Sequence, residues 1–316
     1  MHQGKKSIKI ENGGVNCLES DVADLISDVF SCDKNKIANV SVLKKGMTNR
    51  SYLFEVNNDK YLIRIPGEGT DKLIDRKAEY DVYKTISGKG ICDDPIYINP
   101  DNGYKITKYL KGVRCADPEN EEDLIKCMKK LRDFHSLELN VQHRFDLFEQ
   151  ALFYESLRKD IASLYKDYEE TKKNAFQLRN FIEKHVEKEV LTHIDAVPDN
   201  FLFYVNDEGK EDLQLTDFEY AGMQDPHVDI AMFCIYSLYD RSQIDHLIDI
   251  YFEGRCSFQN RIKIYCYIAI AGLLWSNWCE YKLLFGVEFG EYAIRQYQYA
   301  KDYYQIARSE MEHIDG

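Results

Sequence analysis

Tryptophan, proline and long apolar runs are scarce in this sequence, and basic residues are fewer than acidic ones, 41 against 54. Its net charge of −13 argues against nucleic acid or an anionic membrane surface as the main partner and suits a cationic one. No stretch reaches the ~18 uncharged apolar residues of a membrane span, and no signal-peptide core follows the polar start. The nine cysteines have no CxxC or paired Cys/His spacing, so neither a zinc site nor a disulfide framework is indicated. We therefore expect a cytoplasmic protein with reduced thiols and no membrane insertion.

What the sequence does contain is enough apolar residues for a sizeable core. Hydrophobic residues make up 44% and charged residues 30% of the chain, as in ordinary globular proteins. Its 316 residues suit about two domains of ~150 residues each. Strand patterns dominate residues 1–110 and helical patterns dominate residues 111–316. We therefore expect an α+β protein with a small antiparallel-sheet domain followed by a large, mostly helical domain.

The N-terminal domain is predicted to hold a packing helix and then five strands with one inserted helix. Alternating apolar residues and the turns between them mark the strands. The predicted helices cover residues 17–35 and a stretch from Thr70 or Asp71 to Ile86, and the predicted strands cover residues 39–43, 52–56, 60–65, 94–98 and 104–110. Lys111 and Gly112 break the last strand, so we expect the hinge between the domains there.

The C-terminal domain follows helical periodicity almost throughout. Its first helix is predicted from an Asp117 N-cap and Pro118 to about Leu137, with His135 beside the buried stripe in a structural role. Further helical stretches cover residues 145–190, 229–238, 244–252, 261–284 and 289–311, with a charged, solvated connection at residues 166–173. Residues 201–205 and 213–216 are predicted to form a hairpin.

One short loop before that hairpin carries most of the residues that could perform chemistry. It contains His193, Asp195 and Asn200, and the hairpin brings Asp217 back beside Asn200. An amide oxygen next to a carboxylate is a suitable pair of hard ligands for Mg²⁺. Asp195 is then placed to meet a substrate hydroxyl. A His-x-Asp pattern alone would be weak, since either residue could cap a turn.

Two residues are expected to shape this loop rather than to react. His193 is predicted to orient it by bonding backbone groups, and Asp229 to hold it from below by accepting hydrogen bonds. The alternative is a metallohydrolase site built on His193 and Asp195, but no second histidine pair lies nearby.

Phosphate-binding groups are predicted in the N-terminal domain. Four residues of the loop at residues 44–51 can offer backbone N–H groups or polar side chains to a triphosphate: Gly46, Thr48, Asn49 and Ser51. An ordinary hairpin loop would look the same. Arg64 lies on a strand that faces the helix carrying Glu79, and an arginine held by a glutamate can bind phosphates with its planar fork. The backbone before the hinge is where an adenine edge would pair, at Thr107, Lys108, Tyr109 and Leu110.

The two tryptophans, Trp275 and Trp278, are three residues apart on one face of a predicted helix, and Tyr292 opens the next helix. Aromatic faces hold quaternary ammonium groups, which have no N–H to donate, through attractions of about 0.5 to 2 kcal/mol each. A tryptophan pair at this spacing also fits an ordinary helical core. The spacing alone leaves both interpretations open.

These motifs together resemble the signature of the aminoglycoside phosphotransferase and choline kinase superfamily of protein-kinase-like enzymes. The loop, followed by Asp217-Phe218-Glu219-Tyr220, is similar to the kinase catalytic loop and its metal-binding motif. Arg64 stands where choline kinases carry arginine and aminoglycoside kinases usually carry lysine. The run 274–278 followed by 289–293 resembles the choline pocket. The resemblance covers about residues 40–305 and favours choline kinases of the bacterial LicA type.

The resemblance implies a bilobal, kinase-like fold and transfer of the ATP γ-phosphoryl group to the hydroxyl of choline. Asp195 would orient and deprotonate the alcohol, while Asn200 and Asp217 would hold Mg²⁺. Arg64, kept in place by Glu79, would bind phosphates. The choline head would lie among Trp275, Trp278 and Tyr292, with Glu219 or Tyr220 nearby.

One departure from the family bears on the substrate. After Phe233 and Cys234, where eukaryotic choline kinases tend to carry an acid, this chain has Ile235. We therefore expect ethanolamine, whose ammonium needs hydrogen-bond acceptors, to be a poorer substrate. The nearest rival is an aminoglycoside or other small-alcohol kinase of the same fold. A non-catalytic binding protein is a different class, but the occupied catalytic positions disfavour it. The sequence leaves the oligomeric state open.

Overall fold

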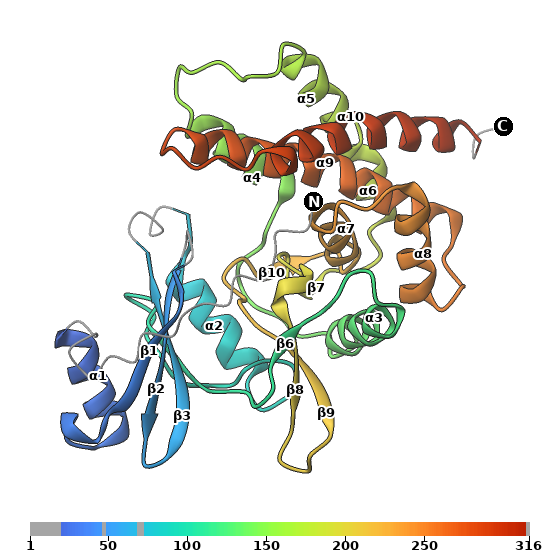
Figure 1. Ribbon diagram of the computed structural model, residues 1–316. Coiled ribbons are helices and arrows are strands. Elements are labelled where there is room, and N and C mark those ends of the chain that lie inside the picture. Colours follow the sequence, from blue (N-terminus) through green and yellow to red (C-terminus); the bar gives the residue numbers. More distant parts are fainter. Residues whose placement is uncertain (1–19, 46–48, 68–72, 314–316) are drawn as a thin grey trace. The chain divides into compact units, whose positions relative to one another are not determined.

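The computed structural model describes residues 20–45, 49–67 and 73–313. The chain folds as two compact units, one of Met1–Val113 with Tyr204–Lys210 and the other of Arg114–Phe203 with Glu211–Gly316. We call them the sheet unit and the helical unit. The sheet unit is built on an antiparallel sheet and the helical unit mostly on α-helices (Figure 1). The predicted α+β fold class is confirmed.

The sheet unit contains a five-stranded antiparallel sheet in the order β1-β2-β3-β5-β4. Its strands are β1 (Ala38–Lys45), β2 (Asn49–Val56), β3 (Asp59–Pro66), β4 (Pro95–Ile98) and β5 (Lys105–Lys108). The described helices of this unit are α1 (Ser20–Phe30), the 3₁₀ helix η2 (Lys34–Lys36) and α2 (Arg76–Ile86). The five predicted strands and the inserted helix are therefore present.

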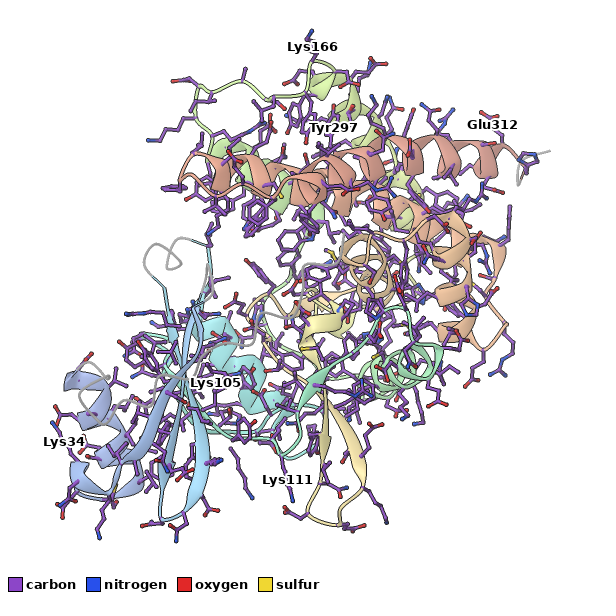
Figure 2. All side chains as sticks on the ribbon, viewed as in Figure 1. Lys34, Lys105, Lys111, Lys166, Tyr297 and Glu312 are labelled. Carbon is purple, nitrogen blue, oxygen red and sulfur yellow. The ribbon has the colours of Figure 1, made fainter. Side chains whose placement is uncertain are left out.

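Helices α1 and α2 cover opposite faces of this sheet (Figure 1). Successive side chains on a strand point to opposite faces, so neighbouring residues of β3 contact different helices. Ile26 of α1 belongs to the same buried cluster as Ile63 of β3. Arg64, the next residue of β3, faces α2 and pairs with Glu79. Lys105 of β5, labelled in Figure 2, also lies under α2, 4.3 Å from the centre of the Tyr83 ring. The sheet thus packs apolar side chains against α1 and places two cationic side chains, Arg64 and Lys105, under α2.

The predicted loop at residues 44–51 is too long. β1 and β2 pair as far as Lys45 and Arg50, so Asn49 and Ser51 are strand residues of β2. Gly46 and Thr48 lie outside the described residues. The error arises because polar residues at the end of a hairpin fit a strand and a loop equally well.

The predicted start of α2 near residue 70 is also wrong. The helix begins at Arg76, and the side chain of Asp75 is its N-cap. Asp75 accepts hydrogen bonds from the backbone N–H groups of Lys77 and Ala78 at 3.0 and 3.1 Å. This cap satisfies two N–H groups that have no partner within the helix, and it fixes the first turn.

The helical unit is organised around α9 (Phe258–Leu283), which is buried along most of its length. α9 packs against α4, α7 and α10, and it runs beside α10 (Figure 1). The other helices are α3 (Glu121–Ser136), α4 (Leu147–Ser156), α5 (Tyr168–Gln177), α6 (Arg179–His185), α7 (His227–Tyr236), α8 (Arg241–Phe252) and α10 (Glu291–Glu312). Among the residues that the structure describes, no helix is long and apolar enough to cross a membrane.

Two predictions in the helical unit are wrong in detail. The charged stretch at residues 166–173 is not a solvated connection, because α5 begins at Tyr168 and buries Thr171. The hydroxyl of Tyr297 on α10 (Figure 2) lies 2.8 Å from Asp167 and 2.9 Å from Thr171. Contacts with a distant helix therefore override the polar local sequence.

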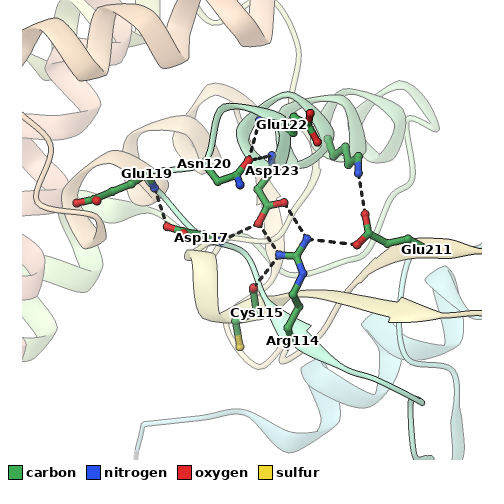
Figure 3. Close-up of polar contacts among 9 residues, drawn as sticks. Arg114, Cys115, Asp117, Glu119, Asn120, Glu122, Asp123 and Glu211 are labelled. Carbon is green, nitrogen blue, oxygen red and sulfur yellow. Dashed lines mark hydrogen bonds and ion pairs between the residues drawn. The ribbon is translucent and has the colours of Figure 1, made fainter. Parts of the chain in front are cut away.

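The predicted N-cap of α3 is the second error. Asn120, not Asp117, caps this helix, and its side-chain oxygen accepts hydrogen bonds from the second and third helical N–H groups at 2.9 and 3.2 Å (Figure 3). Asp117 instead accepts a hydrogen bond from the N–H of Glu119 in the preceding turn. Both residues are good caps, so composition alone does not choose between them.

Two small sheets carry the loop that contains Asp195. β7 (Val190–Thr192) pairs with β10 (Gly222–Gln224), and β8 (Phe201–Val205) lies between β6 (Arg114–Cys115) and β9 (Glu211–Leu215). The β8–β9 hairpin is present as predicted, although β9 begins earlier, at Glu211. β6, β7 and β10 are not predicted by the sequence pattern, because each has only two or three residues and pairs with a distant segment.

Arg114 fastens β6 to its neighbours. Its guanidinium forms an ion pair with Asp123 of α3 at 2.5 Å and another with Glu211 of β9 at 3.3 Å (Figure 3). Shortly after Arg114, the N–H of Ala116 lies within hydrogen-bond distance of two backbone oxygens around η4 (Pro198–Asn200). This network therefore braces one side of the loop that contains Asp195.

Candidate active site

The loop between β7 and β8 is held at its start by the carboxylate of Asp229, a fully buried residue of α7. Asp229 accepts hydrogen bonds from the backbone N–H groups of His193 at 3.0 Å and Ile194 at 2.8 Å. Ile194 has a φ of +69°, which costs a β-branched residue about 1–3 kcal/mol. The two charge-assisted hydrogen bonds stabilise that conformation. The predicted role of Asp229 in holding this loop is confirmed.

His135 of α3 orients Asp229 in turn. Its Nε2 lies 2.9 Å from Asp229 Oδ2, and its Nδ1 lies 2.9 Å from the hydroxyl of Tyr251 on α8. Both nitrogens of this buried ring are engaged in holding other side chains, as expected for a structural histidine. The start of the loop is therefore tied to α3, α7 and α8 together.

The imidazole of His193 bonds the end of the hairpin. It is fully buried, and its Nε2 lies 2.8 Å from the carbonyl oxygen of Thr216. A carbonyl can only accept, so Nε2 carries the proton. Burial lowers the pKa of His193, against the opposing charges of Asp229 and Asp217. A neutral ring that donates to the backbone fits the predicted orienting role better than proton transfer.

Asn200 connects Asp195 to Asp217. Its side-chain Nδ2 donates to the backbone oxygen of Asp195 at 2.9 Å and to Asp195 Oδ2 at 3.0 Å. Its backbone oxygen accepts a hydrogen bond from the N–H of Thr216 at 3.0 Å, which brings the next residue, Asp217, alongside. Because Nδ2 is committed to Asp195, the amide oxygen is the atom of Asn200 that can bind a cation.

The carboxyl group of Asp195 is strongly perturbed. Burial, together with the charges of Asp217 and Glu219, raises its pKa to about 8, although the hydrogen bond from Asn200 opposes this shift. A cation bound among these carboxylates would lower this pKa again, because it favours the ionised form. The loop therefore forms an acidic centre that suits a bound cation and can accept a proton.

Aromatic side chains form a continuous group beside this acidic centre, which we call the aromatic cluster. Its members are Tyr220, Tyr236, Trp275, Trp278, Phe289 and Tyr292, and the centroids of neighbouring rings are 4.9 to 6.3 Å apart. Both tryptophans are only 8% exposed. The indole N–H of Trp275 donates to the sulfur of Met232 at 3.1 Å.

The charge of Asp195 reaches this cluster. Burial is the main cause that raises the pKa values of Tyr220, Tyr236 and Tyr292, and the charge of Asp195 contributes to each. Glu219, whose side chain is buried, adds to the effect on Tyr220. Tyr220 and Tyr292 are therefore within range of the charge of Asp195, and ring contacts join Trp275 and Trp278 to them.

Tyr236 is a residue of the aromatic cluster that the sequence pattern did not single out. It is the last residue of α7, and its hydroxyl donates to Asp199 Oδ2 at 2.8 Å. The available signal was its position directly after Ile235, where the family resemblance already placed an acceptor-site residue. A tyrosine at the end of an apolar helix otherwise looks like part of the core.

The predicted pair of Arg64 and Glu79 is present in the sheet unit and includes a second arginine. Arg64 pairs with one oxygen of Glu79, and Arg76 pairs with the other at 2.9 Å. All three side chains are buried. Gly103, with a φ of +71°, lies against Arg76, and a Cβ there would be 2.5 Å from Arg76 Cδ. Glu79 is therefore fixed from both sides, and glycine leaves the room that Arg76 needs.

The predicted adenine-binding backbone is partly committed to the sheet. Thr107 is buried in β5 and pairs with strands on both of its sides. The N–H of Tyr109 donates to the carbonyl oxygen of Lys60 at 2.9 Å. Lys108 is exposed and Leu110 is half-buried. A backbone donor to a nucleotide base would therefore come from a residue other than Tyr109.

Comparisons with known proteins agree with this arrangement. A family model described as choline/ethanolamine kinase matches residues 40–253. Protein LicA of Haemophilus influenzae is 26% identical over 267 residues, which cover 79% of this chain and 76% of that protein. The crystal structure of choline kinase LicA from Streptococcus pneumoniae has a TM-score of 0.75 at 26% identity and covers 90% of this chain and 99% of that one.

A structure of LicA in complex with AMP gives a similar match, with a TM-score of 0.74 and 27% identity over 92% of this chain and 100% of that chain. The family model covers well over half of the sequence, and the shared fold extends over most of both chains. The chain therefore belongs to the choline/ethanolamine kinase family and is a small-molecule kinase.

Proposed function

We propose that the protein transfers the γ-phosphoryl group of ATP to the hydroxyl group of choline in an Mg²⁺-dependent reaction. The observation that carries this proposal is the aromatic cluster beside Asp195. A quaternary ammonium has no N–H to donate, so ring faces worth about 0.5–2 kcal/mol each replace hydrogen bonds in its recognition. The names of the LicA relatives, one a choline kinase and one bound to AMP, support the same choice.

Choline would bind with its ammonium head against Trp275, Trp278 and Tyr292. Glu219 adds a negative charge near Tyr220 and Asp195, since it raises the pKa values of both. A positive head group is attracted to both the ring faces and this carboxylate. Choline's hydroxyl, two carbons away from the head, would then lie toward Asp195.

Asp195 would orient this hydroxyl and accept its proton as the oxygen attacks the phosphorus atom. Asn200 fixes the carboxylate by donating to Oδ2, so the other oxygen can face the substrate. A positioned base of this kind contributes about 10²- to 10⁴-fold in rate. His193 would keep the loop in register through Thr216.

The donor set around Asp195 fits Mg²⁺. The amide oxygen of Asn200 and the carboxylate of Asp217 are hard oxygen ligands, and Mg²⁺ characteristically takes only one or two protein ligands beside phosphates and water. When bound, the ion would neutralise charge on the phosphates. Arg64, held by Glu79 and Arg76, would supply further positive charge to the nucleotide.

Ethanolamine should be a poorer substrate than choline. Its primary ammonium needs hydrogen-bond acceptors, and Ile235 provides no side-chain acceptor at the position where eukaryotic relatives tend to carry an acid. An aminoglycoside would suit the acidic charge of the chain but not a compact aromatic site. Both alternatives are tested together with choline in one assay.

ADP release from ATP and Mg²⁺ should be measured with choline, ethanolamine and kanamycin in parallel. We expect turnover with choline, and Trp278→Ala should raise its KM by about 3- to 30-fold with a smaller change in kcat. Phe258→Ala, which removes an exposed ring from the start of the same helix, is the control and should change neither constant. Turnover with kanamycin alone, or an unchanged KM for choline in Trp278→Ala, would refute the proposal.

A further inference from the structure

A lysine of the protein itself lies on a ring of the aromatic cluster. Lys282 follows Trp278 by one helical turn on α9, and its Nζ is 5.4 Å from the centre of the Trp278 ring. A cation within ~6 Å of a tryptophan face is attracted by the ring. Lys282 therefore makes with Trp278 the kind of contact that a substrate ammonium would make.

Lys282 also experiences the charge of the carboxylate that would attract the substrate. Burial lowers the pKa of Lys282, and the charge of Glu219 opposes this. The same Glu219 charge acts on Asp195 and Tyr220. The half-buried ammonium of Lys282 therefore interacts with the ring of Trp278 and with the charge of Glu219, the two groups that would also attract the ammonium of the substrate.

A second lysine–aromatic pair, on α2, can be compared with the pair of Lys282 and Trp278. Lys84 lies 5.4 Å from the centre of the Tyr80 ring, four residues earlier on α2. Lys84 is exposed, and Tyr80 is no part of the aromatic cluster. Lys282 has the same spacing and distance but is half-buried and is affected by the charge of Glu219.

We propose that the ammonium of Lys282 competes with the ammonium of the acceptor substrate for Trp278 and Glu219, and that it thereby sets the affinity of the site for cations. This inference rests on the proposed function. Two positive charges cannot share one ring and one carboxylate without repulsion. The head group of the substrate therefore has to displace Lys282 toward solvent. A substrate with several ammonium groups would be repelled by Lys282 through each of them.

Fluorescence of the protein's tryptophans gives a direct assay, because Trp275 and Trp278 are the only two in the sequence. Tetramethylammonium is a suitable probe, since it has the onium group but no hydroxyl to phosphorylate. Titrations should compare the wild type with Lys282→Met, Lys282→Arg and the matched control Lys84→Met. Methionine keeps an unbranched side chain against the ring and removes the charge.

We expect Lys282→Met to lower the Kd for tetramethylammonium by about three- to tenfold, which corresponds to about 0.7–1.4 kcal/mol. Lys282→Arg, which keeps the charge, and Lys84→Met should stay near the wild-type value. The KM for choline should fall by a similar factor in Lys282→Met, with kcat little changed. A lower KM with little change in kcat would not be expected if Lys282 only stabilised the helix.

An unchanged or higher Kd in Lys282→Met would overturn the inference, and so would an equal fall in Lys282→Arg, which would mean that shape and not charge is responsible. Failure of the proposed function has a different signature. In that case the wild-type fluorescence would not respond to tetramethylammonium or choline at all.

Discussion

Replacing Asp229 by asparagine should loosen the loop that carries Asp195 without removing any apolar contact of the site. Oδ2 of Asp229 accepts from the N–H of His193 and contacts His135 Nε2, while Oδ1 accepts from the N–H of Ile194. An asparagine has one acceptor oxygen, which would stay with the two partners of Oδ2. Its NH₂ group would then face the N–H of Ile194, so two donors would meet.

The expected cost follows from these contacts. A hydrogen bond to a charged group contributes about 1.5–3 kcal/mol, and a buried N–H left unsatisfied costs about 1–3 kcal/mol. We therefore expect the free energy of unfolding to fall by about 3 kcal/mol. Ile194 can also relax from its positive φ once its N–H is released, and this would displace the next residue, Asp195. A shift of ~1 Å in a reacting group lowers the rate by about 10²-fold.

Urea unfolding and kcat should both be measured for Asp229→Asn. Asp133→Asn is the matched control, because that carboxylate forms only an exposed ion pair with Lys129 on α3. The control should lose less than about 1 kcal/mol and no activity. A loss of stability in Asp229→Asn no larger than in the control, together with an unchanged kcat, would refute the reasoning.

Three other perturbations have defined outcomes. From pH 7 to pH 5 the wild type should lose about 2 kcal/mol of unfolding free energy relative to His227→Gln, because burial lowers the pKa of His227 from 6.5 to about 4 and the unfolded chain therefore takes up the proton first. Lys263→Met should cost about 3–5 kcal/mol in urea unfolding, because it leaves the buried carboxylate of Asp225, 2.6 Å from Lys263 Nζ, without its cation. Gly103→Ala should raise the KM for ATP more than it lowers kcat, because its Cβ would displace Arg76 from Glu79.

Each of these has a control in the same chain. Comparison with His227→Gln cancels the other titrating groups, such as Asp195, and an equal pH dependence in both proteins would exclude His227 as the cause of the difference. Asp225→Asn added to Lys263→Met should recover part of the loss, whereas no recovery would mean that the unpaired charge is not responsible. Gly88→Ala has a similar positive φ, +72°, but open space around its Cβ. A KM for ATP as high as in Gly103→Ala would show that backbone strain, not Arg76, is the cause.

Features encoded by nearby residues could be predicted from the sequence. The loop of His193, Asp195 and Asn200 follows from spacing within one segment, and the β8–β9 hairpin then dictates that Asp217 returns beside it. The long periodic patterns that became α9 and α10 give helices whose ends are shifted by a few residues. Arg64 and Glu79 could be paired because strand alternation and helix position each point to the same face.

Features that depend on distant residues could not be predicted. β7 and β10 are three residues each, and their pairing, not their composition, makes them strands. The second arginine on Glu79 needs Gly103, which lies far along the chain from Arg76. Tyr236 and Lys282 look like an ordinary helix end and an ordinary surface lysine until the fold brings them to the aromatic cluster.

The start of α3 illustrates a different limit. Asp117 and Asn120 are both good caps, and the local rule has no means of choosing between them. In the structure Asp123, in the first turn, is bound by Arg114 of β6, which lies outside the helix. Arg114 also pairs with Glu211 of β9, a distant residue, so the contacts at this boundary extend beyond the candidate caps themselves.

Phosphorus-31 NMR of a reaction mixture tests the phosphorylation of choline most directly. Purified protein with ATP, MgCl₂ and choline should form phosphocholine and ADP in equal amounts, and Asp195→Asn should slow the reaction by about 10²- to 10⁴-fold. Release of inorganic phosphate without phosphocholine, or phosphocholine formed equally fast by Asp195→Asn, would contradict the proposed role of this site.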